Sequence, residues 1–335
     1  MSKVTDFQRW FPSYSRVNAH LIGDKLTTPS YRILCIPGAG STDQIFVQAK
    51  APGAKNVENT LLKYAEENNI EILAMVLPGR AQRSGEEHYK SIIDVINDFY
   101  PVFEEHFVNS LDSSSEIVPW ILISHSMGGL IAFELLKRLK YQYIMLNFTG
   151  SNIKTTNESI YSVMCDRNIF PQIVVIMSTV SPDTPKQELP WNESKNMNTE
   201  EFKEECRRWG INNEVFRKGI WEEFEPLLRS DFHLFDSYNL LEVDTQNYSS
   251  NEAIYSLMYP LGVRKVQLWS ATEDKRATKS AMYGWIKLVA CHNGDISEHE
   301  IQAGHNFLHN LKTRNIFMDY LCSAIDVLVL EKEYY

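Results

Sequence analysis

The sequence predicts an α/β fold: a mainly parallel β-sheet flanked by helices on both faces, with a helical insertion late in the chain. Up to residue 126, apolar runs of strand length alternate with amphipathic stretches of helical period, as expected for a mainly parallel sheet. The strand-like runs end in loops rich in glycine, where α/β folds place ligands. Residues 185–260 have almost no strand-like run and carry apolar residues at helical spacing instead.

Length and composition fit one globular domain. The chain has 335 residues, of which 44% are hydrophobic, so we expect a single domain over residues 1–335 with the insertion inside it. The net charge of −10 argues against nucleic acid or an anionic membrane surface as a partner. Five widely spaced cysteines without a C-x-x-C pair indicate neither a metal site nor a disulfide framework. Neither a signal-peptide pattern nor a membrane-length apolar run is present, which favours a cytoplasmic protein.

The first predicted strand, 31–36, ends at Pro37-Gly38-Ala39-Gly40-Ser41. This loop lacks the Lys-Ser/Thr ending of a nucleotide loop and the third glycine of a dinucleotide fingerprint. In a serine hydrolase, a loop after an early strand supplies one backbone N–H of the oxyanion hole. Ala39 is the candidate for that donor.

A helix over 56–68 and a strand over 70–77 come next, and the strand ends at Pro78-Gly79-Arg80. Arg80 could contact an anionic part of a substrate, or it could brace its loop through a carboxylate. A further amphipathic helix over 91–107 should be kinked or shortened by Pro101. The polar residues 112–115 should form a surface turn.

The strand-like run 121–125 stops at Ser126, and apolar residues return at helical spacing from Leu130. A serine on such a strand–turn–helix has a strained backbone, which needs small residues two positions before and after it; here they are Ser124 and Gly128. Ser126 is therefore a candidate nucleophile, and the Met127 N–H at the helix N-terminus is a candidate oxyanion donor. The alternative is an ordinary turn that contains two serines.

A central strand over 170–177 precedes the insertion at 185–260, in which we expect helices at 200–209 and 214–238. The apolar stripe of these helices could be core or a substrate wall; in the second case the insertion is a lid over an active site. Polar stretches near 149–168 and 241–256 indicate surface insertions. The positive charges at 137–140 should lie near a helix C-terminus and away from the site.

A late strand over 264–270 is followed by Glu273 and Asp274, where this fold class places the acid of a catalytic triad. Asp274 is the first choice and Glu273 the reserve. His305 follows a glycine in a loop that opens the final helix, after the acid in the chain, so it is the candidate base. His125 is adjacent to the serine, but its side chain should point away from the nucleophile.

Together these motifs resemble the type II thioesterases of nonribosomal peptide and polyketide synthesis, relatives of the thioesterase that releases medium-chain products from animal fatty acid synthase. The resemblance runs from about residue 32 to 311 and rests on Ile36-Pro37-Gly38-Ala39-Gly40, Leu77-Pro78-Gly79-Arg80, His125-Ser126-Met127-Gly128-Gly129, Glu225-Pro226-Leu227-Leu228-Arg229-Ser230-Asp231-Phe232, Asp274 with Trp285, and Ala303-Gly304-His305-Asn306-Phe307-Leu308. It implies an α/β-hydrolase fold with a helical lid and no metal or redox cofactor. It also implies a triad of Ser126, Asp274 and His305, with an oxyanion hole at Ala39 and Met127.

The chain departs from the family pattern at three positions and in length. Ser41 and Ser124 replace glycines, Asn306 replaces the usual phenylalanine, and the two polar insertions lengthen the chain. None of these changes removes a catalytic group. They bear on the range of substrates, because Asn306 is adjacent to the candidate base.

The resemblance implies hydrolysis of acyl or aminoacyl thioesters from the phosphopantetheine arm of a carrier protein. A carboxylesterase or peptidase of the same fold would share the triad, and a non-catalytic ligand receptor is the rival from another class. Lys275, Arg276 and Lys279 follow the candidate acid at the rim of the sheet and could dock an acidic carrier protein. The alternative for these three residues is a solvated loop.

Overall fold

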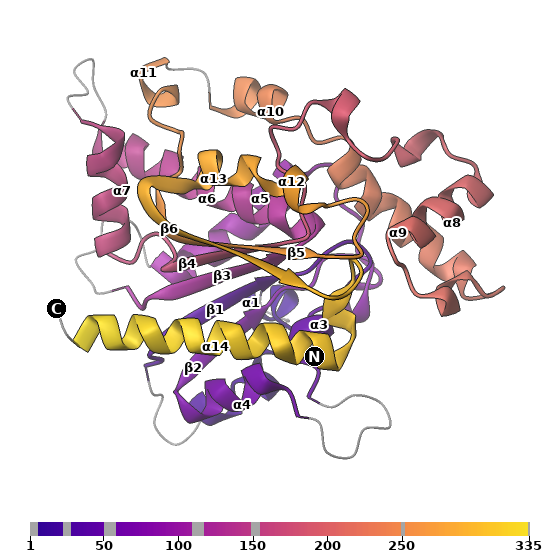
Figure 1. The fold of residues 1–335 in the computed structure, drawn as a ribbon, viewed down its shortest axis with the longest axis horizontal. Helices are drawn as coiled ribbons and strands as arrows, with labels where there is room; N and C mark the ends of the chain where they lie inside the picture. Colours follow the sequence, from indigo (N-terminus) through magenta and orange to yellow (C-terminus); the bar gives the residue numbers. More distant parts are fainter. Residues whose placement is uncertain are drawn as a thin grey trace.

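The computed structural model describes residues 6–22, 28–49, 58–108, 117–148, 155–248 and 252–333 (Figure 1). The turn expected at 112–115 and parts of both polar insertions, 149–154 and 249–251, lie outside these residues. The strands are β1 (Tyr31–Ile36), β2 (Ile70–Ala74), β3 (Trp120–His125), β4 (Ile173–Met177), β5 (Val263–Ala271) and β6 (Ala290–Ile301). The α-helices are α1 (Asp6–Trp10), α2 (Tyr14–Val17), α3 (Gln44–Val47), α4 (Thr60–Glu67), α5 (Ile92–Phe103), α6 (Met127–Asn147), α7 (Asn157–Asp166), α8 (Thr199–Arg208), α9 (Trp221–Asp236), α10 (Leu240–Asn247), α11 (Glu252–Tyr255), α12 (Lys279–Met282), α13 (Gly284–Val289) and α14 (Leu311–Glu333). The short helical turns are η1 (Ala19–Leu21), η2 (Ala81–Arg83), η3 (Glu104–Val108), η4 (Lys186–Glu188), η5 (Ser194–Asn196), η6 (Asn213–Phe216) and η7 (Phe307–His309).

The strands form one sheet in the order β2-β1-β3-β4-β5-β6, and every neighbouring pair is parallel. In this register Ile33 of β1 lies opposite Ile72 of β2 and Ile121 of β3. Because all strands point the same way, their carboxyl ends meet at one edge of the sheet. The predicted parallel sheet is confirmed.

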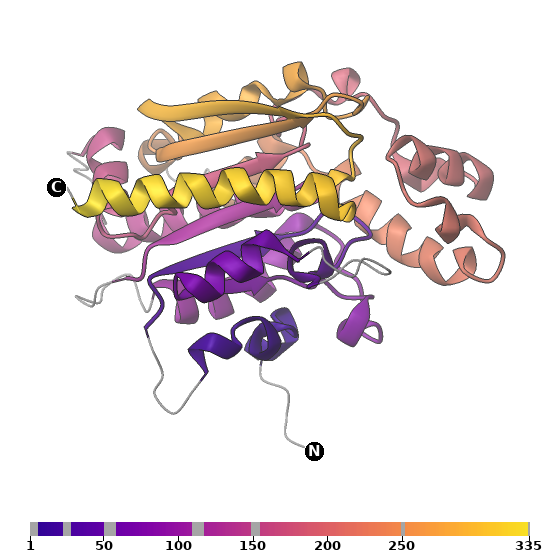
Figure 2. The ribbon, with the colours of Figure 1, turned by 60° about the horizontal axis from the view of Figure 1, so that its bottom comes forward.

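Alternate residues of each strand face opposite sides of the sheet, so the strands contribute to two apolar clusters. In β1, Leu34 and Ile36 belong to one cluster and Ile33 and Cys35 to the other. Helices α5, α6, α7 and α13 cover the first face, and α3, α4 and α14 cover the second (Figure 2). Burying one large apolar side chain contributes about 1.5–3 kcal/mol, and both faces supply many of them.

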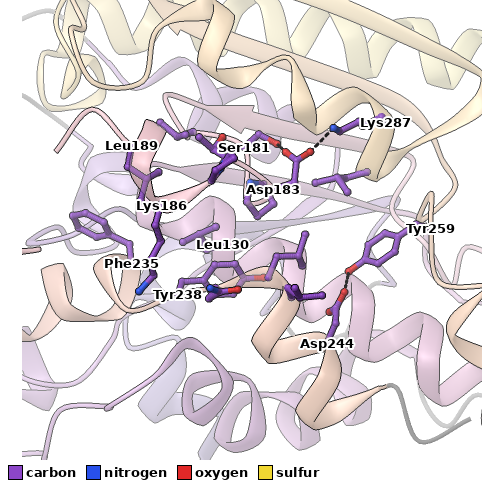
Figure 3. Close-up of a pocket in the computed structure, with 18 of the residues that line it drawn as sticks. Leu130, Ser181, Asp183, Lys186, Leu189, Phe235, Tyr238, Asp244, Tyr259 and Lys287 are labelled. Atoms are coloured by element: carbon purple, nitrogen blue, oxygen red, sulfur yellow. Dashed lines mark hydrogen bonds and ion pairs between the residues drawn. The ribbon is translucent and has the colours of Figure 1, made fainter. Parts of the chain in front are cut away.

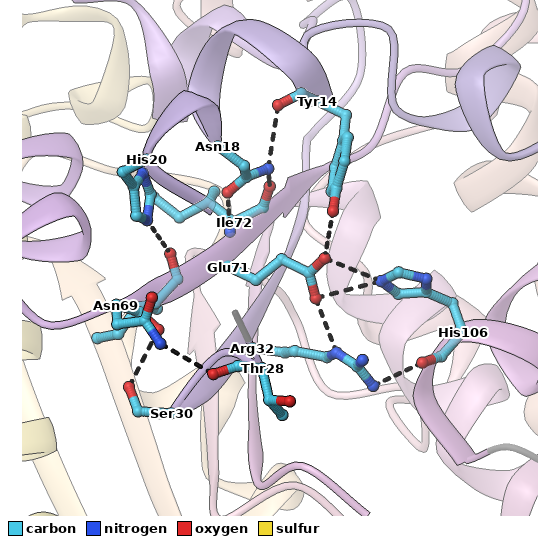
Figure 4. A network of polar contacts seen from close by, with 11 residues as sticks. Tyr14, Asn18, His20, Thr28, Ser30, Arg32, Asn69, Glu71, Ile72 and His106 are labelled. Atoms are coloured by element: carbon cyan, nitrogen blue, oxygen red, sulfur yellow. Dashed lines mark hydrogen bonds and ion pairs between the residues drawn. The ribbon is translucent and has the colours of Figure 1, made fainter. Parts of the chain in front are cut away.

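A polar network attaches the N-terminal helices to the edge of the sheet (Figure 4). The Glu71 carboxylate of β2 accepts a hydrogen bond from the Tyr14 hydroxyl at 2.6 Å and pairs with the Arg32 guanidinium at 2.7 Å. His106 Nε2 lies 3.2 Å from the same carboxylate. Although burial opposes it, these contacts lower the pKa of Glu71 to about 2, beginning with the hydrogen bond and charge of His106.

The helices α8 and α9 lie beyond the carboxyl-end edge of the sheet, where Figures 1 and 2 both place them. They correspond to the predicted helices at 200–209 and 214–238; the second divides into η6 and α9. The helix expected at 91–107 ends as α5 soon after Pro101 and continues as the π-helical turn η3.

The charges at 137–140 are not placed as predicted, because α6 continues to Asn147 and Lys137 and Lys140 are fully buried. The Lys137 ammonium pairs with Glu134 at 2.7 Å and with Asp244 of α10. Lys140 donates to the Asn157 side chain at 2.6 Å and to the Pro260 carbonyl at 2.7 Å. These contacts attach α10 and α7 to the core, so neither polar stretch is only a surface insertion. No helix in the described ranges combines the length and apolar character needed to cross a bilayer.

Candidate active site

Ser126 occupies a strained turn between β3 and α6, with φ 54° and ψ −127°. Its N–H donates to the Met177 carbonyl at 2.8 Å, and its carbonyl accepts from the Thr179 hydroxyl at 2.8 Å. A Cβ on Gly128 would lie 2.5 Å from the Ile36 carbonyl oxygen, so the turn packs directly on the end of β1. The need for a small residue two positions after Ser126 thus has a physical cause in this chain.

Three residues far apart in the sequence meet at this turn. His305 Nε2 lies 2.8 Å from Ser126 Oγ, and His305 Nδ1 lies 2.7 Å from Asp274 Oδ2. All three are buried, with relative exposures of 8% for Ser126, 6% for His305 and 7% for Asp274. An imidazole that donates from Nδ1 to a carboxylate presents Nε2 as an acceptor for the serine hydroxyl, as a general base requires.

Asp274, and not Glu273, contacts the histidine. The second oxygen of Asp274 accepts the backbone N–H groups of Arg276 at 2.8 Å and Ala277 at 3.1 Å. Burial alone would raise the pKa of this carboxyl, but the hydrogen bond and charge of His305, together with these two N–H groups, lower it. The exposed Glu273 accepts a bond from the Gln302 amide at 3.1 Å and takes no part in the cluster.

The loop that carries Ala39 lies beside the serine turn. A Cβ on Gly38 would lie 2.9 Å from the Ser126 Cβ, so this loop and the turn are in close contact. The next N–H, of Gly40, donates to Asp231 Oδ2 of α9 at 2.7 Å, which fixes the loop around Ala39. Ala39 thus lies in a loop that contacts the Ser126 turn, and Met127 follows Ser126 at the start of α6.

Arg80 braces this loop. Its guanidinium is 2.6 Å from Asp231 Oδ1 and donates to the Ser41 carbonyl at 3.1 Å, with a relative exposure of 5%. Buried and paired in this way, Arg80 cannot serve as a docking residue, and the bracing alternative from the sequence holds.

The proposed docking residues differ in their surroundings. Arg276 forms a two-oxygen ion pair with Glu205 of α8, at 2.5 and 2.6 Å, so its charge is already matched. Lys279 pairs with Glu298 at 3.3 Å on the surface. Lys275 is exposed, and no side-chain contact is recorded for it among the described residues.

Two contacts of His305 were not foreseen from the sequence. His125 Nε2 donates to the His305 carbonyl oxygen at 2.9 Å, so His125 supports the loop that carries the base. Trp209, directly after α8, packs against the imidazole with ring centroids 4.8 Å apart. The position of His125 beside the serine was a signal for the first contact; no local signal marks the second.

Two cavities border the elements that carry the site, although Ser126, Asp274 and His305 do not line either of them. One, of about 510 Å³, is bounded by Leu130 of α6, the loop after β4, and residues of α9 and α10 (Figure 3). The hydrogen-bonded pairs Lys287–Asp183 and Tyr259–Asp244 form part of its wall. The other, of about 460 Å³, is bounded by Ala39, Gly40 and Asn306 together with residues of the helical insertion. No cluster of three or more His, Cys, Asp or Glu side chains suited to a metal ion occurs in the described ranges.

The sequence matches no protein-family model and no curated protein. Among solved structures, the thioesterase RedJ from the prodiginine biosynthetic pathway in Streptomyces coelicolor aligns over 90% of each chain, with a TM-score of 0.57 and 17% identity. ClbQ from the colibactin NRPS/PKS pathway covers 90% of this chain and 98% of its own, with a TM-score of 0.59 and 16% identity. The type II thioesterase YbtT from the Yersiniabactin NRPS/PKS pathway covers 90% and 94%, with a TM-score of 0.55 and 18% identity. The chain has the α/β-hydrolase fold.

In an α/β-hydrolase fold the nucleophile, the acid and the base follow one another along the chain, as Ser126, Asp274 and His305 do here. At such low sequence identity, the structural alignments establish the fold but not the chemistry. The chemistry depends on the residues of this chain.

Proposed function

We propose that this protein is a serine hydrolase that cleaves thioesters, and that its substrates are acyl or aminoacyl groups on the phosphopantetheine arm of a carrier protein. The observation that carries the proposal is the chain of hydrogen bonds from Ser126 through His305 to Asp274, at the strained turn between β3 and α6. The structural neighbours RedJ and YbtT, described as thioesterases, support the choice of a thioester over other acyl compounds.

In the proposed reaction, His305 Nε2 takes the Ser126 proton while Oγ attacks the thioester carbonyl. The N–H groups of Ala39 and Met127 bind the oxyanion, and Asp274 stabilises the imidazolium. The C–S bond breaks and the thiolate leaves, taking the proton from His305. Water then repeats the attack on the acyl-serine with His305 as base, which releases the acid and regenerates Ser126.

The two cavities fit the two halves of a thioester. The leaving thiol must lie on the side of His305, which returns the proton, so the cavity beside Ala39 and Asn306 suits the pantetheine arm. The larger cavity contains Leu130, one helical turn after Ser126, and its wall is mainly apolar, which suits the acyl group. Because Asn306 replaces the phenylalanine usual in this family, it would change the contacts of the arm and not those of the acyl chain.

The domain organisation that we propose is one domain over residues 1–335, with residues 185–260 as a lid. The supporting observation is that α9 lines the larger cavity through Phe235, as does Tyr238 just after the helix, while Phe224 and Leu228 of α9 line the smaller one. A helix shared by both cavities must move if a bulky carrier-bound substrate is to enter.

We propose Lys275 as the docking residue of this rim, since Arg276 and Lys279 are already paired. A protein with a net charge of −10 needs a local positive charge to receive an acidic carrier protein. Lys275→Glu should raise KM for an acylated carrier protein severalfold and leave hydrolysis of a small acyl-pantetheine unchanged. Arg264→Glu, at the opposite end of β5, is the matched control and should change neither. Equal losses on both substrates would mean damage to the neighbouring Asp274.

The experiment that tests the function uses matched pairs of substrates. We expect hydrolysis of an acyl-pantetheine thioester to exceed that of the corresponding oxyester, and a panel of acylated carrier proteins, followed by intact mass, to reveal the preferred acyl group. Preference for the oxyester or for peptides would instead indicate a carboxylesterase or a peptidase. Failure of a fluorophosphonate to label Ser126 would indicate a non-catalytic receptor.

A further inference from the structure

Trp209 connects the helical insertion to the candidate base. It follows α8 directly, and its indole meets the His305 imidazole at a centroid distance of 4.8 Å and an interplanar angle of 77°. This edge-to-face arrangement is the favoured geometry for two aromatic rings. No other aromatic ring from the described part of the insertion is recorded in contact with His305.

The end of α8 is also fastened to the loops that carry the base and the acid. Asn306, the residue after the base, donates from Nδ2 to the Trp209 carbonyl at 2.9 Å. Arg276 pairs with Glu205, one turn before Trp209, while its own N–H donates to Asp274 at 2.8 Å. A displacement of α8 would therefore be transmitted to both the acid and the base.

The indole itself is held by packing and not by a hydrogen bond. Its Nε1 is buried and has no partner among the described residues. Its other ring neighbours are Trp191 at 5.1 Å, Phe235 at 5.4 Å and Phe232 at 6.2 Å. The last two belong to α9, so the position of the indole depends on how the insertion is seated.

We propose that Trp209 is a positioning residue for His305, through which the seating of the helical insertion controls whether the imidazole is held between Ser126 and Asp274. With the insertion in place, the indole blocks rotation of the imidazole away from its two hydrogen bonds. When α8 and α9 move outward, the imidazole is released and the triad is no longer aligned. This inference rests on the proposed function, but its spectroscopic test does not require a substrate.

The titratable and charged groups around His305 determine how the spectroscopic test is interpreted. They are Asp274 on Nδ1, His125 at a ring distance of 5.3 Å, Arg276 near the acid, and His309 in the next helical turn. Burial lowers the pKa of His125 to about 3, with a further contribution from the charge of His305. Burial also lowers the pKa of His309, and the charges of Arg314 and His305 act in the same direction. Burial therefore favours the neutral form of both neighbouring imidazoles.

The experiment compares Trp209→Phe and Trp209→Ala with the wild-type chain. With a small acyl-pantetheine thioester, Trp209→Ala should lower kcat by roughly 10- to 100-fold with KM changed less than about threefold, because a misplaced catalytic group costs rate and not substrate binding. Trp209→Phe keeps an aromatic edge on the imidazole and should restore kcat to within about threefold of wild type. The fluorescence emission of Trp209 is obtained by subtracting the spectrum of Trp209→Phe from that of the wild type. This emission should decrease as His305 gains a proton. The decrease should be absent when the same comparison is made in a His305→Ala background.

Trp221→Ala is the matched control, because Trp221 is also a buried tryptophan of the insertion. Among the described residues its Nε1 has no partner, and its ring contacts Phe202 and Phe216 and not His305. This variant should lower stability without removing the pH-dependent emission. Equal loss of kcat in Trp209→Ala and Trp221→Ala would overturn the inference, as would pH-independent emission of Trp209. If the wild type hydrolyses no thioester while the emission still follows His305, the proposed function fails and the contact between lid and base stands.

Discussion

Arg80 and Asp231 form a buried ion pair that joins the loop after β2 to helix α9 of the insertion. Asp231 holds Arg80 with one oxygen, at 2.6 Å, and the Gly40 N–H with the other, at 2.7 Å. Two motifs that lie 151 positions apart, Pro78-Gly79-Arg80 and the segment around Pro226, thus meet through this single carboxylate. The pair fixes the residue next to Ala39, so it supports the proposed oxyanion hole.

The first prediction is that Asp231→Ala destabilises the protein strongly and impairs catalysis. It leaves the buried Arg80 guanidinium without a carboxylate partner, and breaking a buried ion pair in this way typically costs about 3–5 kcal/mol. It also removes the acceptor of the Gly40 N–H. We therefore expect kcat to decrease by a larger factor than any change in KM. Urea unfolding and steady-state kinetics would measure the two effects. Glu67→Ala, which breaks the exposed Lys63–Glu67 pair, should change stability by less than about 0.5 kcal/mol; similar effects of both variants would argue against the bracing role.

The second prediction concerns the triad. Ser126→Ala and His305→Ala should each lower kcat by about 10⁴-fold or more, and Asp274→Asn should lose most of the rate through the wrong imidazole tautomer. Because the three groups act as a unit, the double variant Ser126→Ala/His305→Ala should be little worse than either single variant. Glu273→Gln is the control and should stay active, since Glu273 contacts Gln302 and not His305. Nearly additive losses would contradict the assignment.

The third prediction is that Gly128→Ala disrupts the serine turn. Its Cβ would lie 2.5 Å from the Ile36 carbonyl oxygen and 2.7 Å from that of Pro37, and neither backbone atom can move without shifting β1 or the Ala39 loop. We expect a loss of stability of about 1–3 kcal/mol, typical of overpacking, together with a marked loss of kcat. At Gly85 an added Cβ would meet nothing within 4 Å, so Gly85→Ala should be neutral in both thermal unfolding and kinetics. An active, stable Gly128→Ala protein would contradict the close packing.

The fourth prediction is a pH dependence of stability from Glu71. Its pKa in the folded protein is about 2, below the ordinary value of 4.5. The stabilisation from this carboxylate is therefore fully present above pH 4.5 and is lost as the pH falls towards 2, with a magnitude on the order of 3 kcal/mol. In urea unfolding, the difference between wild type and Glu71→Gln should be largest near pH 7 and should shrink between pH 4.5 and 2. The exposed Glu66 offers a control, because Glu66→Gln should show no such trend; a difference independent of pH would contradict the assigned network.

The parts of the fold and of the site that the sequence predicted are those with a local signal. Apolar runs mark the strands that are buried on both faces, and the demand for small residues marks the turn at Ser126. Strand β6 was missed because it lies at the edge of the sheet and its interior residues are half-buried or exposed, so no apolar run appears. The placement of Lys137 and Lys140 was predicted wrongly, because their burial depends on contacts with Asp244 and Pro260, more than 100 positions away.

The contacts that complete the site are also long-range. The sequence alone does not indicate which carboxylate pairs with Arg80. The partner is defined only by the tertiary structure, in which α9 lies over the loop after β1. Trp209 is one of seven tryptophans in the chain, and nothing in its immediate neighbours distinguishes it. Spacing along the chain identified the triad residues as candidates, whereas the elements that hold them in place emerged only from tertiary structure.

The packing of α14 affects how the chain folds while it is being synthesised. Its residues Phe317, Leu321 and Ile325 cover the apolar face formed by Ile33, Ile72 and Ile121, together with α4. On the ribosome, these three strands emerge well before the helix that covers them, since β3, the last of the three, ends at His125 and α14 begins at Leu311. A nascent chain that has reached β5 therefore exposes a broad apolar surface, the kind of intermediate that aggregates unless a chaperone binds it. The protein cannot complete its core during translation until residues beyond 310 have left the exit tunnel.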